Sequence, residues 1–319
     1  MMNLEYINMI ELVKYKTQNK QEWDSFLDIS KISTFLFKRD FMEYHSDRFV
    51  DCSFLIYIKS KLKAILPGNI FNNSYFSHQG LTYGGLICSP TTTTKEVLEI
   101  FTRLNDTLKS EGIKEVVYKP TPHIYHKYPS EEDIYALYRL GAVKIACNIS
   151  STIFQKQKQP FTQSRKGGVN KAINNNVRVL ETTDYSDFWR VLEDNLARTY
   201  SKKPVHSLEE IQKLSDSFPN NIRLFCAYLN DLILGGTVLF IAESIVHVQY
   251  ISANQRGKAV GALDLIFDKL INELFRSYSI FDFGQSTEQE GNYLNEGLIF
   301  QKEGFGGRGI VYETYKYSL

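Results

Sequence analysis

The sequence that decides the fold is IVHVQYISANQRGKAVGALDLIFDKLINELFRSYSIFDF, residues 245–283. Its first part, Ile245–Ser252, alternates apolar and polar side chains in the way of a half-buried strand. The apolar residues of Val260–Phe275 have helical spacing, and Ser279–Phe283 is a short apolar strand. A strand, a crossover helix and a second strand indicate a parallel β-α-β unit, and therefore an α/β fold with mixed sheets.

The same order of elements occurs twice along the chain, which indicates a duplication. The chain has 319 residues, about twice a common domain length, so two compact domains are expected. The polar stretch Gln155–Gln163 offers little to bury, and we therefore predict domains 1–157 and 158–319. The predicted pairs are two opening helices (Gln21–Ser30, Tyr185–Tyr200), two hairpins (Phe54–Leu66, Leu224–Phe240), two strand-helix units (Tyr75–Ile87 with Lys95–Ser110, Ile245–Ser252 with Val260–Phe275), two return strands (Glu115–Tyr118, Ser279–Phe283) and two final strands (Val143–Phe154, Ile310–Tyr317).

Composition excludes several classes of protein. Lys and Arg total 37 against 36 for Asp and Glu, so a net charge of +1 provides no global field for DNA or an anionic membrane. The four cysteines are widely scattered, and we predict no metal site. Charges interrupt every hydrophobic run, and Glu5 and Glu11 lie where a signal peptide needs an apolar stretch. A cytoplasmic protein without an integral membrane segment is expected.

The order hairpin, strand, helix, strand, helix, strand resembles the GNAT fold, and its duplication resembles the bacterial FemAB-type aminoacyltransferases that build peptidoglycan bridges. The local matches are Glu22–Phe26 (EWDSF), Ser164–Ala172 (SRKGGVNKA) and Phe300–Gly306 (FQKEGFG). The resemblance implies two tandem GNAT-like domains, the first binding the acceptor and the second holding the donor and the catalytic cleft. It implies an N-acyltransferase that acts on a primary amine of a small molecule or a cell-envelope precursor.

The resemblance leaves the donor open between an acyl-CoA thioester and an aminoacyl-tRNA ester. The helical arm that often accompanies tRNA-dependent members is absent from this sequence, and the net charge is close to zero. Both features favour acyl-CoA. A catalytically inactive binding module of the same fold is the alternative from a different class.

Family members bind the pyrophosphate of coenzyme A with a loop of the form Gln/Arg-x-x-Gly-x-Gly/Ala before a helix. Here Arg256-x-x-Ala259-x-Gly261 matches it, with Ala in place of the first Gly. Backbone amides at such a loop bind anions. An ordinary turn into a helix is the alternative interpretation. The predicted cofactor-binding residues are Arg256, Gly257, Lys258, Ala259, Gly261 and Ala262.

The predicted catalytic residues are His247, Tyr250 and Lys302. In an alternating strand His247 and Gln249 share one face, and Val248 and Tyr250 share the other. A histidine in the cleft can act as general base because its ordinary pKa lies near neutral. By resemblance, Lys302 contacts the acyl donor or stabilises negative charge. The alternatives are a histidine satisfied by polar neighbours and a surface lysine.

Acceptor contacts are predicted from both halves of the chain. Ligands of open α/β sheets bind outside the carboxyl ends of strands, which points to the segment after Phe283. The first half contributes Arg48 and His78 by resemblance, with an Arg48–Asp51 ion pair as the structural alternative. A basic cluster either binds phosphate or is a solvated helix face. The predicted substrate-binding residues are Arg48, His78, Gln249, Gln285, Ser286, Asn292 and Asn295, and the basic cluster is Arg165, Lys166, Lys171 and Arg178.

Overall fold

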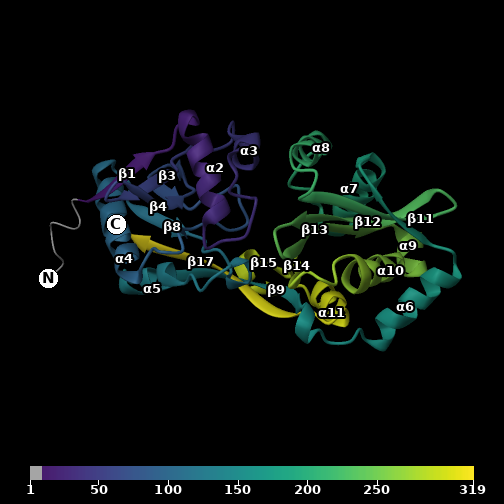
Figure 1. Cartoon of the computed structure of the whole chain (residues 1–319). Helices are drawn as coiled ribbons and strands as arrows, with labels where there is room; N and C mark the ends of the chain where they lie inside the picture. Colours follow the sequence, from purple (N-terminus) through teal and green to yellow (C-terminus); the bar gives the residue numbers. More distant parts are fainter. Residues whose placement is uncertain (1–8) are drawn as a thin grey trace. The chain divides into compact units, whose positions relative to one another are not determined.

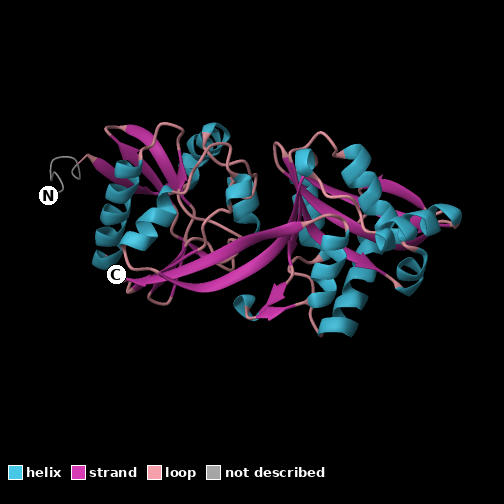
Figure 2. Cartoon of the chain, turned by 90° about the horizontal axis from the view of Figure 1, so that it is seen from below, coloured by secondary structure: helices cyan, strands magenta, loops and turns pink. Residues whose placement is uncertain are grey.

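The computed structural model describes residues 9–319, which form two compact units (Figure 1). The first unit takes the chain up to Asn148 and adds the segments Gln289–Asn292 and Val311–Leu319. The second unit comprises Ile149–Glu288 and Tyr293–Ile310. The chain passes from one unit to the other inside the long strands β9 (Val143–Phe154) and β17 (Arg308–Ser318), and on both sides of Gln289–Asn292. Helices and strands are mixed in both units (Figure 2), so the predicted α/β class is confirmed.

The second unit is built on a mixed sheet in the order β10-β11-β12-β13-β14-β9. All its neighbouring strands are antiparallel except β13 and β14, which are parallel as predicted. The strands are β9 (Val143–Phe154), β10 (Arg178–Thr182), β11 (Ile222–Leu229), β12 (Leu232–Ile241), β13 (Ile245–Ala253) and β14 (Ile280–Gln285).

Helices cover both faces of this sheet. One face carries α7 and α8, and the other carries α6, α9, α10 and α11 (Figure 1). The helices are α6 (Gln163–Asn174), α7 (Ser186–Tyr200), α8 (Leu208–Ser217), α9 (Gln255–Val260), α10 (Ala262–Lys269) and α11 (Glu296–Gly304). A small hairpin, β15 (Thr287–Glu288) with β16 (Tyr293–Leu294), precedes α11.

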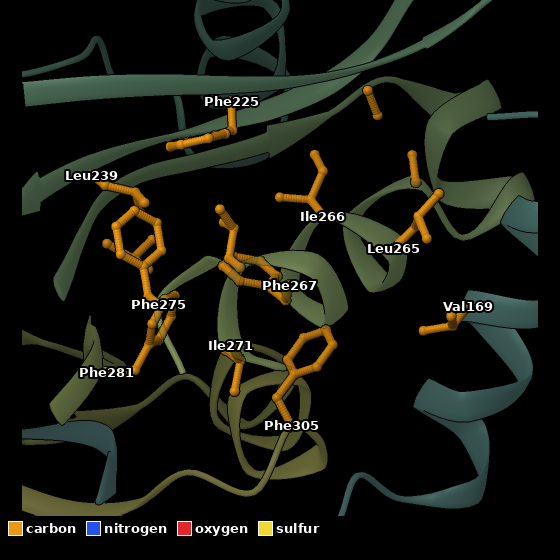
Figure 3. Close-up of a cluster of buried hydrophobic side chains, with 14 of the residues drawn as sticks. Val169, Phe225, Leu239, Leu265, Ile266, Phe267, Ile271, Phe275, Phe281 and Phe305 are labelled. Carbon is orange, nitrogen blue, oxygen red and sulfur yellow. The ribbon is translucent and has the colours of Figure 1, made fainter. Parts of the chain in front are cut away.

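The core of the second unit lies between the sheet and α10. Phe267 of α10 packs against Phe281 of β14 and against Phe305 (Figure 3), and also against Phe283 of β14. Because Phe281 and Phe283 both point into this core, Asp282 between them points to the opposite face of the sheet. This alternation directs a carboxylate away from the aromatic layer.

The helix predicted over Val260–Phe275 is interrupted. Gly261 has a left-handed backbone (φ +77°) and separates α9 from α10. A Cβ at Gly261 would lie 2.3 Å from the carbonyl oxygen of Gly168 in α6, so only glycine fits this close approach. The segment Leu270–Leu274 continues α10 as a π-helical turn.

The first unit contains two sheets, β1-β3-β4-β7 and β17-β8-β6-β5-β2. Its core packs α4 and α5 against them. The strands are β1 (Ile10–Lys14), β2 (Val50–Asp51), β3 (Phe54–Ile58), β4 (Lys61–Leu66), β5 (Asn69–Phe71), β6 (Ser74–Phe76), β7 (Ile87–Cys88), β8 (Glu115–Tyr118) and β17 (Arg308–Ser318), and the helices are α2 (Lys20–Ile29), α3 (Arg39–Met42), α4 (Thr94–Ser110) and α5 (Glu132–Arg139).

The single strand predicted over Tyr75–Ile87 is wrong. It consists of β6 and β7, separated by an irregular segment that includes left-handed residues at His78 and Gly85. β6 pairs in parallel with β8, whereas β7 pairs with β4. β6, α4 and β8 therefore form the predicted parallel strand-helix-strand unit of the first half, and only the extent of its first strand was predicted wrongly.

Candidate active site

β13 and β14 are paired over three positions and then separate. The pairs are Ile245 with Ile280, Val246 with Phe281, and His247 with Asp282. β13 continues to Ala253 without a further partner on β14. The opening between two parallel strands beyond their last pair is where ligands of α/β folds bind. His247 and Asp282 are thus the last paired residues before the opening.

His247 is hydrogen bonded to Asp282. The distance from Nδ1 of His247 to Oδ2 of Asp282 is 2.7 Å. Since a carboxylate can only accept, Nδ1 carries the hydrogen, and in the neutral ring Nε2 is then the acceptor nitrogen. The other oxygen of the buried Asp282 accepts hydrogen bonds from Ser150 Oγ at 2.5 Å and Thr152 Oγ1 at 2.8 Å, both on β9. The carboxylate therefore fixes both the tautomer and the orientation of the imidazole.

The pKa of Asp282 is lowered despite its burial. Burial by itself raises the pKa of this carboxyl, but the hydrogen bond and charge of His247, with the hydroxyls of Ser150 and Thr152, outweigh burial and bring the pKa to about 2. Asp282 is therefore ionised at neutral pH and can stabilise a positive charge that develops on His247.

Gly284 lies beside the imidazole. Its backbone is left-handed (φ +72°), and a Cβ there would be 3.3 Å from Cε1 and 3.7 Å from Nε2 of His247. Any side chain at this position would contact the ring edge that carries the acceptor nitrogen. Because residue 284 is a glycine, it places no side chain against this edge of the imidazole.

Lys302 of α11 is buried, so its interpretation as a surface lysine is wrong. Its Nζ donates hydrogen bonds to the carbonyl oxygens of Gly284 at 2.9 Å and Gln285 at 2.6 Å. Burial lowers the pKa of Lys302 to about 8, against the opposing effect of the Asp282 charge. Gly284 thus joins His247 and Lys302 into one site.

Tyr250 lies on the opposite face of the sheet from Val248, although the two were predicted to share a face. The register between β12 and β13 steps from Leu239–Val248 to Val238–Tyr250, which leaves Gln249 as an extra residue in a bulge. Val248 packs in the α10 core, whereas Tyr250 packs edge-on against Trp189 of α7 with ring centroids 5.1 Å apart. The bulge therefore moves Tyr250 from the face of Val248 to the face of α7.

The predicted donor loop forms most of α9 and its junction with α10, and its glycines have packing roles. Asn254 accepts the hydrogen bond of the Gly257 amide at 2.8 Å through its side chain, so this amide is already satisfied. A Cβ at Gly257 would lie 2.2 Å from the carbonyl oxygen of Leu234. Ala262 is fully buried and Ala259 is exposed. Both glycines are thus explained by packing, as in an ordinary turn into a helix.

Arg256 and Lys258 are exposed and line a groove of about 770 Å³ between α7, the β11–β12 turn and the start of α9. The carboxylates of this groove are already paired, Asp187 with Arg190, Asp194 with Arg198 and Asp231 with Arg178. Lys258 donates to the Asn195 side chain at 3.0 Å. Within residues 9–319, no ion pair of Arg256 is found. The groove therefore has an excess of positive charge.

The substrate-binding residues predicted after Phe283 are only partly brought together. Gln285 is half-buried and Ser286 is buried, next to the site. The Asn295 side chain caps α11 by accepting from the amide of Leu298 at 3.1 Å. Asn292 belongs to a segment of the first unit. Gln285 therefore contacts Lys302 through its carbonyl oxygen, and Ser286 follows it in sequence, whereas Asn295 has a capping role.

In the first unit, His78 is buried and its pKa is lowered to about 3, mainly by burial and further by His45. It is therefore neutral and not a surface contact for an anion. Arg48 lies over the ring of Tyr44 at 5.5 Å. The alternative Arg48–Asp51 pair is wrong, because Asp51 is bound by Arg39 at 2.7 Å.

Two residues of the basic cluster, Arg165 and Arg178, form ion pairs within the second unit. Arg165 forms an ion pair with Asp264 of α10 at 2.8 Å and lies over the ring of Phe305. Arg178 lies in β10, outside the predicted helix, and pairs with Asp231 at 2.6 Å. Both side chains therefore hold elements of the second unit together.

Sequence reasoning missed Asp282, Ser150 and Thr152. A signal existed for Asp282, because it is the one charged residue in the otherwise apolar run Ile280–Phe283. In residues 9–319 no cluster of His, Cys, Asp or Glu could hold a metal ion. No helix in the described part of the chain is both long and apolar enough to cross a membrane.

Residues 166–293 match the family model described as Acetyltransferase (GNAT) domain. Among solved structures, FemX matches at a TM-score of 0.68 and 11% identity, over 97% of each chain. L-PGS from Bacillus licheniformis matches at 0.60 and 10%, over 95% of this chain and 91% of the other. A tandem GNAT protein from the clavulanic acid biosynthesis pathway matches at 0.54 and 8%, over 97% and 98%. No curated protein matches the sequence significantly.

Proposed function

We propose that this chain, whose residues 166–293 match a GNAT acetyltransferase domain and whose fold is similar to FemX and to a tandem GNAT protein, is an N-acyltransferase that moves an acyl group from acyl-CoA to a primary amine of a small molecule or cell-envelope precursor. The observation that carries the proposal is the His247–Asp282 pair at the point where β13 and β14 separate. The division into domain 1–157 for the acceptor and domain 158–319 for donor and catalysis is part of the proposal, as is a cytoplasmic location, where acyl-CoA is available.

In the proposed reaction the amine attacks the thioester carbon directly. Nε2 of His247 takes the proton of the attacking amine, and ionised Asp282 stabilises the imidazolium that forms. The carbon–nitrogen bond forms, the carbon–sulfur bond breaks, and the thiolate receives the proton to leave as free thiol. Backbone amides of β13 at the Gln249 bulge stabilise the oxyanion. Lys302 holds the Gly284 backbone against the imidazole.

The groove beside α9 supports a donor with a long arm and a phosphorylated end. β13 rises about 3.3 Å per residue, so its end at Ala253 lies about 20 Å from His247. The thioester at His247 and the phosphates at Arg256 and Lys258 would then be joined along β13. Guanidinium and ammonium groups bind phosphate through charge-assisted hydrogen bonds. Side chains, rather than the amide of Gly257, would make these contacts.

The test is calorimetric binding and thermal stabilisation with acetyl-CoA and desulfo-CoA. The double variant Arg256→Ala, Lys258→Ala is expected to weaken binding by about 100-fold or more, since each charge-assisted contact contributes about 1.5–3 kcal/mol and the variant removes two of them. Arg276→Ala, an exposed arginine elsewhere in the second unit, is the matched control. Thiol release from acetyl-CoA with a panel of primary amines then tests turnover.

Absence of binding by acetyl-CoA and by desulfo-CoA would overturn the acyl-CoA donor. Aminoacyl-tRNA would then be the donor to test, and its binding should weaken steeply with salt. If neither donor bound, the catalytically inactive binding module would be the remaining interpretation of the fold.

A further inference from the structure

The bulge in β13 is held from outside the strand. Tyr250 receives a hydrogen bond from the backbone amide of His206 at 3.2 Å, and its hydroxyl lies 2.6 Å from Nδ1 of the same histidine. His206 precedes α8, so these bonds tie the α7–α8 connection to β13. His206 and Tyr250 are both buried.

The geometry fits a neutral histidine. The backbone amide can only donate, so it uses the hydroxyl oxygen of Tyr250 as acceptor. The hydroxyl is then free to donate its own proton to Nδ1 of His206, which places the ring hydrogen on Nε2. The hydroxyl of Tyr250 thereby accepts from the backbone amide of His206 and donates to the ring of the same residue.

A second contact fixes the backbone at the same place. Thr237 Oγ1 of β12 donates to the carbonyl oxygen of Tyr250 at 2.8 Å, next to the step in register. A bulge interrupts the ladder of backbone hydrogen bonds, so the segment needs other contacts to keep one conformation. Tyr250 is three residues from His247 along β13, and the Gln249 bulge lies between them.

We propose that His206 is a positioning residue for acyl transfer: through the hydroxyl of Tyr250 it holds the bulge of β13 in the conformation that faces the reacting thioester. This inference rests on the proposed function. His206 touches neither donor nor acceptor in this role. It acts by fixing the strand whose backbone amides lie next to His247, where small displacements have large effects on rate.

The experiment uses the full chain with His206→Ala, Tyr250→Phe, the double variant and His206→Asn. In His206→Asn the side-chain oxygen of the introduced amide takes the place of Nδ1 and can accept the Tyr250 proton, so this variant is the rescue. Tyr278→Phe, which removes one hydroxyl elsewhere in the second unit, is the matched control. The readouts are steady-state thiol release from acetyl-CoA with the most active amine of the panel, and amide hydrogen exchange of residues 249–252.

We expect His206→Ala and Tyr250→Phe each to lower kcat about 10-fold with KM for acetyl-CoA changed less than about 2-fold, the double variant being no worse than either single variant. Amide exchange at the bulge should accelerate about 10-fold, and His206→Asn should restore both readouts to within about 3-fold. Faster exchange with unchanged kcat, or unchanged exchange, overturns the proposal. If the wild type released no thiol with any amine, the proposed function would fail, and exchange alone would decide whether His206 holds the bulge.

Discussion

Nδ1 of His247 and Oδ2 of Asp282 lie 2.7 Å apart, on the last residue pair that β13 and β14 share. On the face of the sheet that covers the core, both strands carry apolar side chains at this point, Val246 and Val248 on β13 and Phe281 and Phe283 on β14. On the other side a carboxylate that accepts three hydrogen bonds holds one imidazole. Burying an ionised carboxylate costs desolvation free energy, which the three hydrogen bonds offset. We therefore expect the ionised form of Asp282 to have a role in the reaction.

The first prediction concerns the proton acceptor. His247→Ala should lower kcat about 100-fold, and Asp282→Asn about 10-fold or more, because an amide no longer fixes the tautomer of the imidazole. Thiol release from acetyl-CoA measures both. His123→Ala, an exposed histidine of the first unit, is the control. Wild-type turnover in His247→Ala would remove His247 from the mechanism.

The second prediction is that acid lowers the free energy of unfolding by protonating Asp282. The folded pKa of about 2 lies below the ordinary value of 3.8, so its contribution to stability is present above about pH 4 and is lost as the pH falls through 2. Asp282→Asn should lower the free energy of unfolding at pH 7 by about 3 kcal/mol. Urea unfolding from pH 7 to pH 2 should show the two proteins converging at the acidic end. A difference that does not depend on pH would contradict the assignment.

Gly284→Ala should cost both stability and activity. Its left-handed backbone disfavours alanine by about 1 kcal/mol, and the added Cβ approaches His247. Gly112→Ala is the matched control, because Gly112 is also left-handed (φ +79°) but has nothing within 4 Å of its Cβ position. The melting temperatures of the two variants should fall by similar amounts. A loss of about 10-fold or more in kcat is expected for Gly284→Ala alone.

The burial of Lys302 predicts a rise in stability at alkaline pH. Its folded pKa of about 8 lies below the ordinary 10.5, so between these values the unfolded chain binds more protons and stability increases with pH. Lys302→Met should lack this rise and should also lower kcat, because Gly284 loses its anchor. Urea unfolding at pH 7, 9 and 10 checks the first part.

The control for Lys302 lies in the first unit. Lys119 is also a lysine whose pKa is lowered to about 8 by burial, and its Nζ donates to the carbonyl oxygen of Leu81. Lys119→Met should remove a similar part of the alkaline rise with little effect on kcat. If the two variants lowered kcat equally, the effect of Lys302 would be one of general stability.

Local pattern was sufficient for most elements. The hairpin Leu224–Phe240 became β11 and β12, and the helix Lys95–Ser110 became α4, because each depends on neighbours in sequence. The single strand predicted over Tyr75–Ile87 was wrong, because β6 and β7 pair with different strands, β8 and β4, and such pairing is not local in sequence. The alternation of side chains also gave the wrong face for Tyr250, because a bulge depends on the partner strand.

The sequence by itself determined the α/β class, the duplicated order of elements and the presence of a polar histidine on an inner strand, because these depend on the periodicity of side chains over a few residues. The tertiary structure decided what surrounds that histidine. Asp282 is 35 residues from His247, and Ser150 is 132 residues from Asp282. Their meeting depends on the register of three strands, and register is set by packing of the whole sheet rather than by any local pattern.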